Sequence, residues 1–257
     1  MNHFILIFFL FAFSLVSKSQ ALSKFDWGTY VGIPKGVQII EMVRPDWQAR
    51  TIEAGASWNK FNGVNGNTFY SEEWDTGYVL LQDNRIAKNI SLRFNVYTNE
   101  IYYMEDSKVL VLDPTVSVAE FGLYEQTGDT NKISVFCCGY PTTGSNTDKT
   151  FYHVLVRGRI TFLKHYIKKI MERNNSIGVP ERTFIDSETW YIYDASENKM
   201  IEFKKNKNAL LAALPQYSNK IRAIIQEKHL KLKGETEWVM LFNELNQYIN
   251  PGNETTF

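Results

Sequence analysis

Hydrophobic and polar residues alternate in short runs through the middle of the chain, which is the period expected of half-buried strands. The clearest example is ISLRFNVYTNEIYYME, in which Leu92, Phe94 and Val96 alternate with Arg93, Asn95 and Tyr97. Thr98-Asn99 has the composition of a turn, so this run predicts a hairpin. Runs of the same kind are GYVLLQ, KVLVLDP, VSVAEFGLYE, KISVFCCGY and FYHVLVRGRITFLKHY.

Turn signals separate these runs at short intervals. Pro114 cannot donate to a strand ladder and ends one run, and Arg157-Gly158 divides another. A second hairpin is predicted in TWYIYDASENKMIEFK, with DASEN as its turn, whereas PTTGSNTDKT and ERNNSIGVPERTF are predicted as polar loops. Strands spaced this closely leave no room for crossover helices, so the sequence predicts an antiparallel meander.

The periodicity changes to that of helices after the second hairpin. The first helix is predicted to begin at Asn206 or Asn208, which are good N-cap types, and to end before Pro215. A second helix has Ser218 as its expected cap. Its apolar stripe is Ile221, Ile224 and Ile225, and that of the third helix is Trp238, Leu241, Phe242, Leu245 and Tyr248. We expect both stripes to be core faces.

The predicted fold class is therefore α+β: a curved antiparallel sheet, or an open barrel-like meander, followed by a short C-terminal helical bundle. The expected divisions of the chain are a signal peptide over residues 1–21, an irregular N-terminal arm over 22–65, the β domain over 66–204, a helical tail packed on it over 205–250, and a frayed tail over 251–257.

The first residues indicate export. Phe4 to Val16 is an apolar run of signal-peptide length, too short for a span of about 20 residues, and Ser19 and Ala21 suit cleavage after Ala21. No second long apolar run follows, so we expect no transmembrane segment in the mature chain. The predicted localisation is the periplasm, the outer-membrane surface or the extracellular medium. Export also removes nucleic acid as the ordinary partner.

Charge is distributed unevenly along a chain whose formal net charge is zero. Residues 22–130 contain 9 basic and 15 acidic residues, whereas residues 199–233 contain 9 basic and 2 acidic ones. Such asymmetry can steer a partner, but a solvated face and attraction between the two halves also explain it. The cluster Lys204, Lys205 and Lys207 is interpreted as the exposed joint between sheet and helices.

Candidate chemistry is sparse. Cys137 and Cys138 are adjacent, and neighbouring side chains on a strand point to opposite faces, so two separate small thiols are favoured over a strained vicinal disulfide or a catalytic thiol. Other polar groups have both a structural and a catalytic interpretation, namely the histidines His153, His165 and His229 and the carboxylate pairs Glu72-Glu73 and Glu105-Asp106. Five tryptophans could pack in the core or form a glycan-binding platform: Trp27, Trp47, Trp58, Trp74 and Trp190. No catalytic, cofactor-binding or metal-binding residue is assigned from the sequence, and no cofactor is expected.

The order of the segments resembles a large group of secreted proteins from Bacteroidetes-type bacteria. The resemblance is carried by LRFNVYT (92–98) and LDP (112–114), and by a lysine-rich strand followed by NALLAAL and a final helix. It implies an exported, strand-rich protein with a helical tail, and it carries over no active-site residue.

The leading functional hypothesis is a non-catalytic binding protein of the cell envelope, with an envelope protein or a glycan as the candidate partner. Two alternatives remain open. One is an envelope hydrolase using His153 or His165, and the other is a structural adaptor of an outer-membrane or secretion assembly. The oligomeric state is not indicated.

Overall fold

The computed structural model describes residues 39–42, 44–51, 61–127, 130–174 and 177–250, all within a compact unit that spans Gly32–Phe257. The expected signal peptide and the expected frayed tail lie outside the described residues. Within the described part, no helix is both long and apolar enough to cross a membrane.

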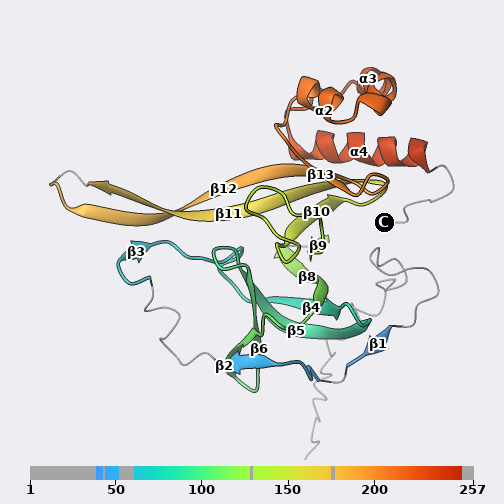
Figure 1. The fold of residues 1–257 in the computed structure, drawn as a ribbon. Helices are drawn as coiled ribbons and strands as arrows, with labels where there is room; N and C mark the ends of the chain where they lie inside the picture. Colours follow the sequence, from blue (N-terminus) through green and yellow to red (C-terminus); the bar gives the residue numbers. More distant parts are fainter. Residues whose placement is uncertain (1–38, 43, 52–60, 128–129, 175–176, 251–257) are drawn as a thin grey trace, which may run out of the picture. The chain divides into compact units, whose positions relative to one another are not determined.

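In the described residues, thirteen strands form one sheet, and helices follow the last strand (Figure 1). The strands are β1 Ile40–Glu41, β2 Ala49–Thr51, β3 Val64–Asn65, β4 Asp75–Leu81, β5 Arg85–Asn95, β6 Glu100–Glu105, β7 Lys108–Leu112, β8 Val118–Thr127, β9 Thr130–Cys137, β10 Tyr152–Val156, β11 Ile160–Asn174, β12 Pro180–Asp194 and β13 Lys199–Phe203. The helices are α2 Lys207–Ala213, α3 Ser218–Glu227 and α4 Glu235–Ile249, with a 3₁₀ turn at Pro215–Tyr217.

The sheet is open and mixed. Its strand order is β13-β12-β11-β10-β9-β8-β4-β5-β6-β7-β2, so β13 and β2 are its two ends. Neighbours along this order pair antiparallel, as expected, but β1 pairs parallel with β5 and β3 pairs parallel with β12. The purely antiparallel sheet is therefore corrected to a mixed one. Both parallel pairs come from residues 22–65, whose polar and irregular pattern gave no strand signal.

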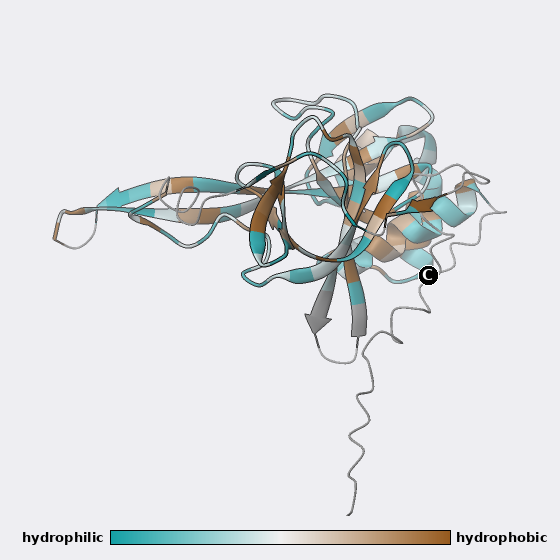
Figure 2. Ribbon diagram, turned by 90° about the horizontal axis from the view of Figure 1, so that it is seen from below, coloured by the Kyte–Doolittle hydropathy of each residue, from teal (hydrophilic) through white to brown (hydrophobic). Residues whose placement is uncertain are grey.

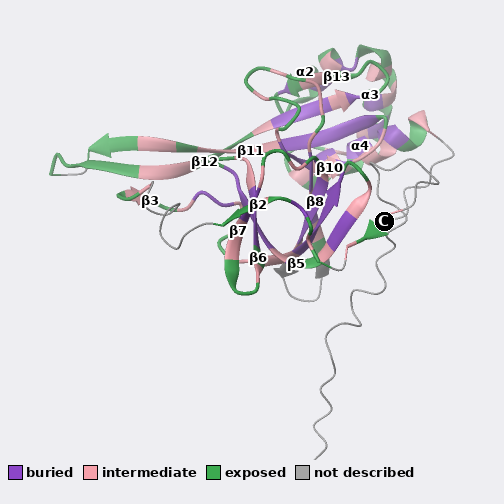
Figure 3. Cartoon of the chain, turned by 60° about the horizontal axis from the view of Figure 1, so that its bottom comes forward, coloured by how far each residue is buried: buried purple, intermediate pink, exposed green. Residues whose placement is uncertain are grey.

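Curvature brings distant strands around a shared interior. One buried cluster contains Trp47 from the segment before β2, Leu112 from β7, Phe94 from β5 and Phe136 from β9. Rings of Phe121 and Phe136 stack in this cluster with centroids 4.9 Å apart. Figure 3 shows the buried residues on the strands that curve around this interior. Leu92 and Phe94 of β5 are buried, as predicted, but Arg93 and Asn95 between them are buried as well. Both faces of the strand are therefore covered at this point, and its burial does not alternate.

The helices pack on the other part of the sheet, around a second buried cluster. It contains Ile160 and Phe162 of β11, Trp190 and Ile192 of β12, and the buried faces of α2, α3 and α4. Phe162 stacks on Phe242 of α4 with ring centroids 4.3 Å apart. The expected stripes are core faces, except that Tyr248 is 56% exposed.

The ends of the helices follow the expected capping only in part. Asn206 caps α2, because its side chain accepts a hydrogen bond from the Ala209 amide at 2.8 Å. Ser218 is not a cap: it is the first residue of α3, and the 3₁₀ turn of Pro215–Tyr217 precedes it. Pro215 ends α2 and, since proline fits the first position of a helix, also begins that turn.

Asn246 of α4 fastens the helix to the turn between β10 and β11. Its amide accepts from the Ile160 N–H at 3.0 Å and donates to the Ile160 carbonyl at 2.8 Å. It also donates to the Phe242 carbonyl at 3.0 Å. A Cβ on Gly158 would lie 2.3 Å from the Asn246 side chain, so only glycine permits this approach. The turn predicted at Arg157-Gly158 is thus confirmed and is also a docking point.

The largest difference from the expected fold is the β11–β12 hairpin. The segment ERNNSIGVPERTF, predicted as a loop, instead continues β11 to Asn174 and begins β12 at Pro180. The two strands pair in one unbroken register from Ile160↔Asp194 to Asn174↔Pro180. Figure 2 shows hydrophobic and hydrophilic residues interspersed along both strands of this hairpin. Charged side chains therefore obscured the strand pattern in the sequence.

Candidate functional site

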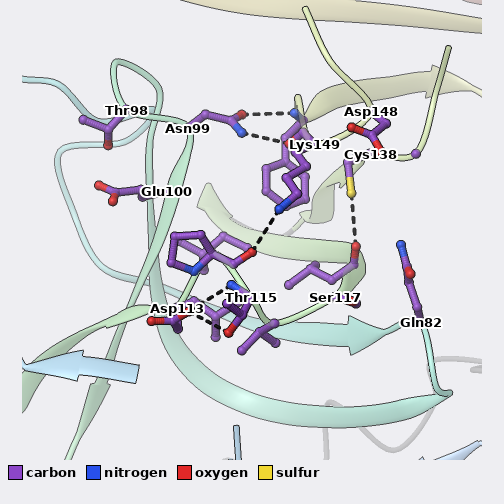
Figure 4. A pocket seen from close by; sticks show the side chains of 17 residues that line it. Gln82, Thr98, Asn99, Glu100, Asp113, Thr115, Ser117, Cys138, Asp148 and Lys149 are labelled. Carbon is purple, nitrogen blue, oxygen red and sulfur yellow. Dashed lines mark hydrogen bonds between the residues drawn. The ribbon is translucent and has the colours of Figure 1, made fainter. Parts of the chain in front are cut away.

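A pocket of about 420 Å³ lies between the β7–β8 connection and the β9–β10 loop (Figure 4). The turn between β5 and β6 completes its wall. Its apolar lining includes Ile101, Leu112, Val118 and Phe151, which belong to or adjoin the interior of the sheet. Polar lining comes from Gln82, Thr98, Asn99, Glu100, Asp113, Thr115, Ser117, Asp148 and Lys149. Pockets that bind small molecules have this mixture of apolar walls and a few polar groups.

Asn99 joins two walls of the pocket. It has a positive φ of 57°, which asparagine tolerates better than most residues, and this directs its side chain toward the β9–β10 loop. The amide donates to the Lys149 carbonyl at 2.9 Å and accepts from the Phe151 N–H at 3.0 Å. The Lys149 ammonium donates in turn to the Pro114 carbonyl at 3.4 Å. Three separate connections are therefore joined by polar contacts.

Carboxylates dominate the charged lining. Asp113 accepts from the Thr115 N–H at 2.9 Å and from the Thr115 hydroxyl at 2.7 Å, and these bonds lower the pKa of its carboxyl. Glu100 pairs with Arg50 at 2.9 Å. Asp148 extends beside Cys138, so the pocket carries three carboxylates and one ammonium. This balance favours ligands that donate hydrogen bonds.

Cys138 lines the pocket as a neutral thiol. It donates to the Val118 carbonyl at 3.1 Å, and burial together with the nearby Asp148 raises its pKa to about 11. A nucleophilic cysteine requires the opposite shift. The thiol is therefore a wall of the pocket and not a reactive group.

Cys137 points to the opposite face of the sheet, which confirms the prediction of two separate thiols. There it lies 3.1 Å from the Arg157 guanidinium and 3.3 Å from the Glu120 carboxylate. Glu120 also pairs with Arg157 and accepts from the Tyr78 hydroxyl. Burial raises the pKa of Cys137 well above its usual range. The buried charges of this cluster are paired with one another, so we assign it a structural role.

The histidines lie away from the pocket. His153 is buried in the interior, its ring stacked on Phe136 and its Nδ1 3.3 Å from the Tyr166 hydroxyl. His165 is on the other face, next to the ring of Tyr152, and burial lowers its pKa to about 4. His229 is exposed beyond the end of α3, with a φ of 52°.

The remaining candidates have structural positions. Trp47 and Trp190 are core residues, Trp74 packs on the cluster of Phe69 and Tyr102, and Trp27 and Trp58 lie outside the described residues. Glu72-Glu73 are exposed, and Glu105-Asp106 lie at the β6–β7 turn. No three His, Cys, Asp or Glu side chains of the described part are grouped to hold a metal ion.

The lysine cluster lies at the start of α2. Lys204 and Lys207 are exposed. Lys205 pairs with Glu188 at 3.2 Å and lies 4.0 Å from the centre of the Trp190 ring. This agrees with the interpretation of the cluster as the exposed joint between sheet and helices.

Sequence reasoning missed the pocket itself, although its landmarks were visible. LDP supplies Leu112, Asp113 and Pro114, and the turn after LRFNVYT supplies Asn99. An aspartate followed two residues later by threonine is a turn signal. The sequence interpretation used only Pro114 here, as the end of a strand.

Comparisons with protein-family models, with curated proteins and with solved structures each found no significant match.

Proposed function

We propose that this protein is a non-catalytic binding protein of the bacterial cell envelope. Its pocket between the β7–β8 connection and the β9–β10 loop receives a small hydroxyl-bearing group, such as the terminal sugar of an envelope glycan. The observation that carries this proposal is the pocket's lining, in which hydrogen-bond acceptors surround apolar walls. Sugars present many hydroxyl donors and an apolar ring face, so they match both parts of this lining.

The thiol and the histidines considered for catalysis do not favour a hydrolase at this pocket. Cys138 is disfavoured as a nucleophile, because its raised pKa keeps it protonated at neutral pH. The hydrolase alternative uses His153 or His165 as its catalytic group, but neither lines this pocket. We assign its carboxylates Glu100, Asp113 and Asp148 to hydrogen bonding with the ligand. A hydrolase that uses either histidine therefore has no support from this pocket.

Thermal denaturation with defined sugars and purified envelope glycans tests the proposal. A ligand that binds only the folded protein raises its Tm as its concentration rises. We expect at least one sugar to stabilise the wild type and to have no effect on S117W, in which a bulky indole replaces the side chain of a residue that lines the pocket. T236W places the same side chain at an exposed position of α4 and should retain the response.

Equal stabilisation of wild type and S117W would place the ligand elsewhere, and no response from any glycan would refute the glycan as ligand. Release of a cleaved product from a bound glycan would refute the non-catalytic role.

A further inference from the structure

The outer part of the β11–β12 hairpin has an open edge. β10 pairs with β11 only at Phe162–Lys164, and β13 pairs with β12 only from Trp190 to Asp194. Beyond these positions the hairpin is two-stranded, apart from β3 at Arg182 and Thr183. In the part of the chain that the structure describes, no strand pairs with the outer edge of β11 over residues 167–174.

Such an edge is a template for another strand. Two-stranded ribbons are marginally stable in water, and an unpaired edge presents a row of backbone donors and acceptors. Figure 3 shows that the outer part of this hairpin has exposed and intermediate residues but none that are buried. Natural proteins protect long edges or use them for association.

We propose that two copies of this chain associate through this edge. β11 pairs antiparallel with β11 of the second copy, and Ile170 lies on the two-fold axis. The result is a continuous sheet in the order β12, β11, the partner's β11, the partner's β12. Because the interface is isologous, the same strand supplies both sides.

Charge complementarity supports this partner. Within one chain, Lys168 lies 2.9 Å from Asp186, and Glu172 lies 4.0 Å from Arg182. With Ile170 opposite its own copy, Lys168 lies opposite the partner's Glu172. A row across the four strands then contains Asp186, Lys168, the partner's Glu172 and the partner's Arg182, which alternate in sign. The two-fold axis repeats this row on its other side.

Apolar residues occupy the centre of the same face. Ile170 is opposite Phe184 on β12, so the central row contains Phe184, Ile170, the partner's Ile170 and the partner's Phe184. Shifts by two residues, which keep each side chain on its face, place Lys169 opposite the partner's Arg173 or the partner's Lys169. Both place like charges in direct opposition, so the sequence of β11 favours the register centred on Ile170.

An engineered cysteine tests this register directly. Opposite residues of an antiparallel pair have Cα atoms about 4.5–5.5 Å apart, which is within the range of a disulfide. I170C should therefore form a covalent dimer under mild oxidation. I185C on β12 is the matched control, because the two copies of β11 lie between it and its own copy. The wild type, with Cys137 buried and Cys138 half-buried, should remain uncrosslinked. Crosslinking of I185C but not I170C would overturn the proposal.

Charge exchange provides a second measurement. In sedimentation equilibrium, K168E and E172K should each weaken dimerisation roughly tenfold, since each places like charges opposite one another twice. An equimolar mixture should recover association, because a heterodimer restores both opposite-charge pairs. The effects of each substitution within its own chain do not change on mixing. A monomeric wild type at high concentration, or a mixture that associates no better than either variant, would overturn the proposal.

Discussion

Replacing Asn246 by leucine should loosen the helices from the sheet. β10 ends at Val156, so no strand of the described part pairs with the Ile160 backbone on that side. The Asn246 amide supplies both of its missing partners. Ile160 is 0% exposed, so water cannot replace them. An unsatisfied buried backbone group costs about 1–3 kcal/mol. With two such groups, partly offset by the added apolar side chain, N246L should lower the free energy of unfolding by about 3 kcal/mol.

Urea denaturation followed by circular dichroism measures this loss. Q247L, at the next and exposed position of α4, makes the same kind of change without removing a buried partner. Its unfolding free energy should stay within about 0.5 kcal/mol of the wild type. An N246L protein as stable as Q247L would refute the role of this amide.

A double-mutant cycle separates the hydrogen bonds from the close approach at Gly158. G158A places a Cβ against Asn246, whereas N246A removes the side chain that it meets. The double variant G158A/N246A should therefore lose less stability than the sum of the single losses. Strict additivity would contradict the contact.

Two further predictions concern titratable groups. Burial lowers the pKa of His165 to about 4 from an ordinary 6.5, so the unfolded chain binds the extra proton first as pH falls. The stability that neutral His165 contributes is complete above pH 6.5 and is lost as the pH falls toward 4. In H165Q, the decrease in unfolding free energy between pH 6.5 and pH 4 should be smaller than in the wild type by about 2 kcal/mol, allowing for partial exposure. Parallel stability curves for the two proteins would contradict this cause. Cys138 has a pKa of about 11, so it should react with iodoacetamide at pH 8 roughly a hundredfold more slowly than a free thiol. Mass spectrometry measures the rate of labelling, and rapid labelling of the folded protein would contradict the protonated state of this thiol.

The sequence predicted those parts of the fold that depend on local signals. Period-two alternation located β5 and β6, Pro114 marked the end of β7, and the helix cap Asn206 was one of the two caps expected. Each signal acts within a few residues, so it does not depend on contacts with distant parts of the chain. The opposite directions of Cys137 and Cys138 follow from strand geometry for the same reason.

Other features depend on contacts that local patterns do not encode. β1 and β3 consist of two residues each, and they are strands only because β5 and β12 are present to pair with them. The outer β11–β12 hairpin is charged on both strands, and its pairing follows from the continuous register set nearer the core. The pocket requires Asn99, Asp113 and Asp148 to meet across three connections, which is a property of the curved sheet.

Calorimetric titration of a stabilising sugar into wild type, D148N and S117W at neutral pH tests the proposed binding role most directly. We predict saturable binding to the wild type, binding to D148N weakened roughly tenfold through loss of a charged acceptor, and no heat of binding for S117W. Equal affinity for all three proteins would contradict the assignment of this pocket as the binding site.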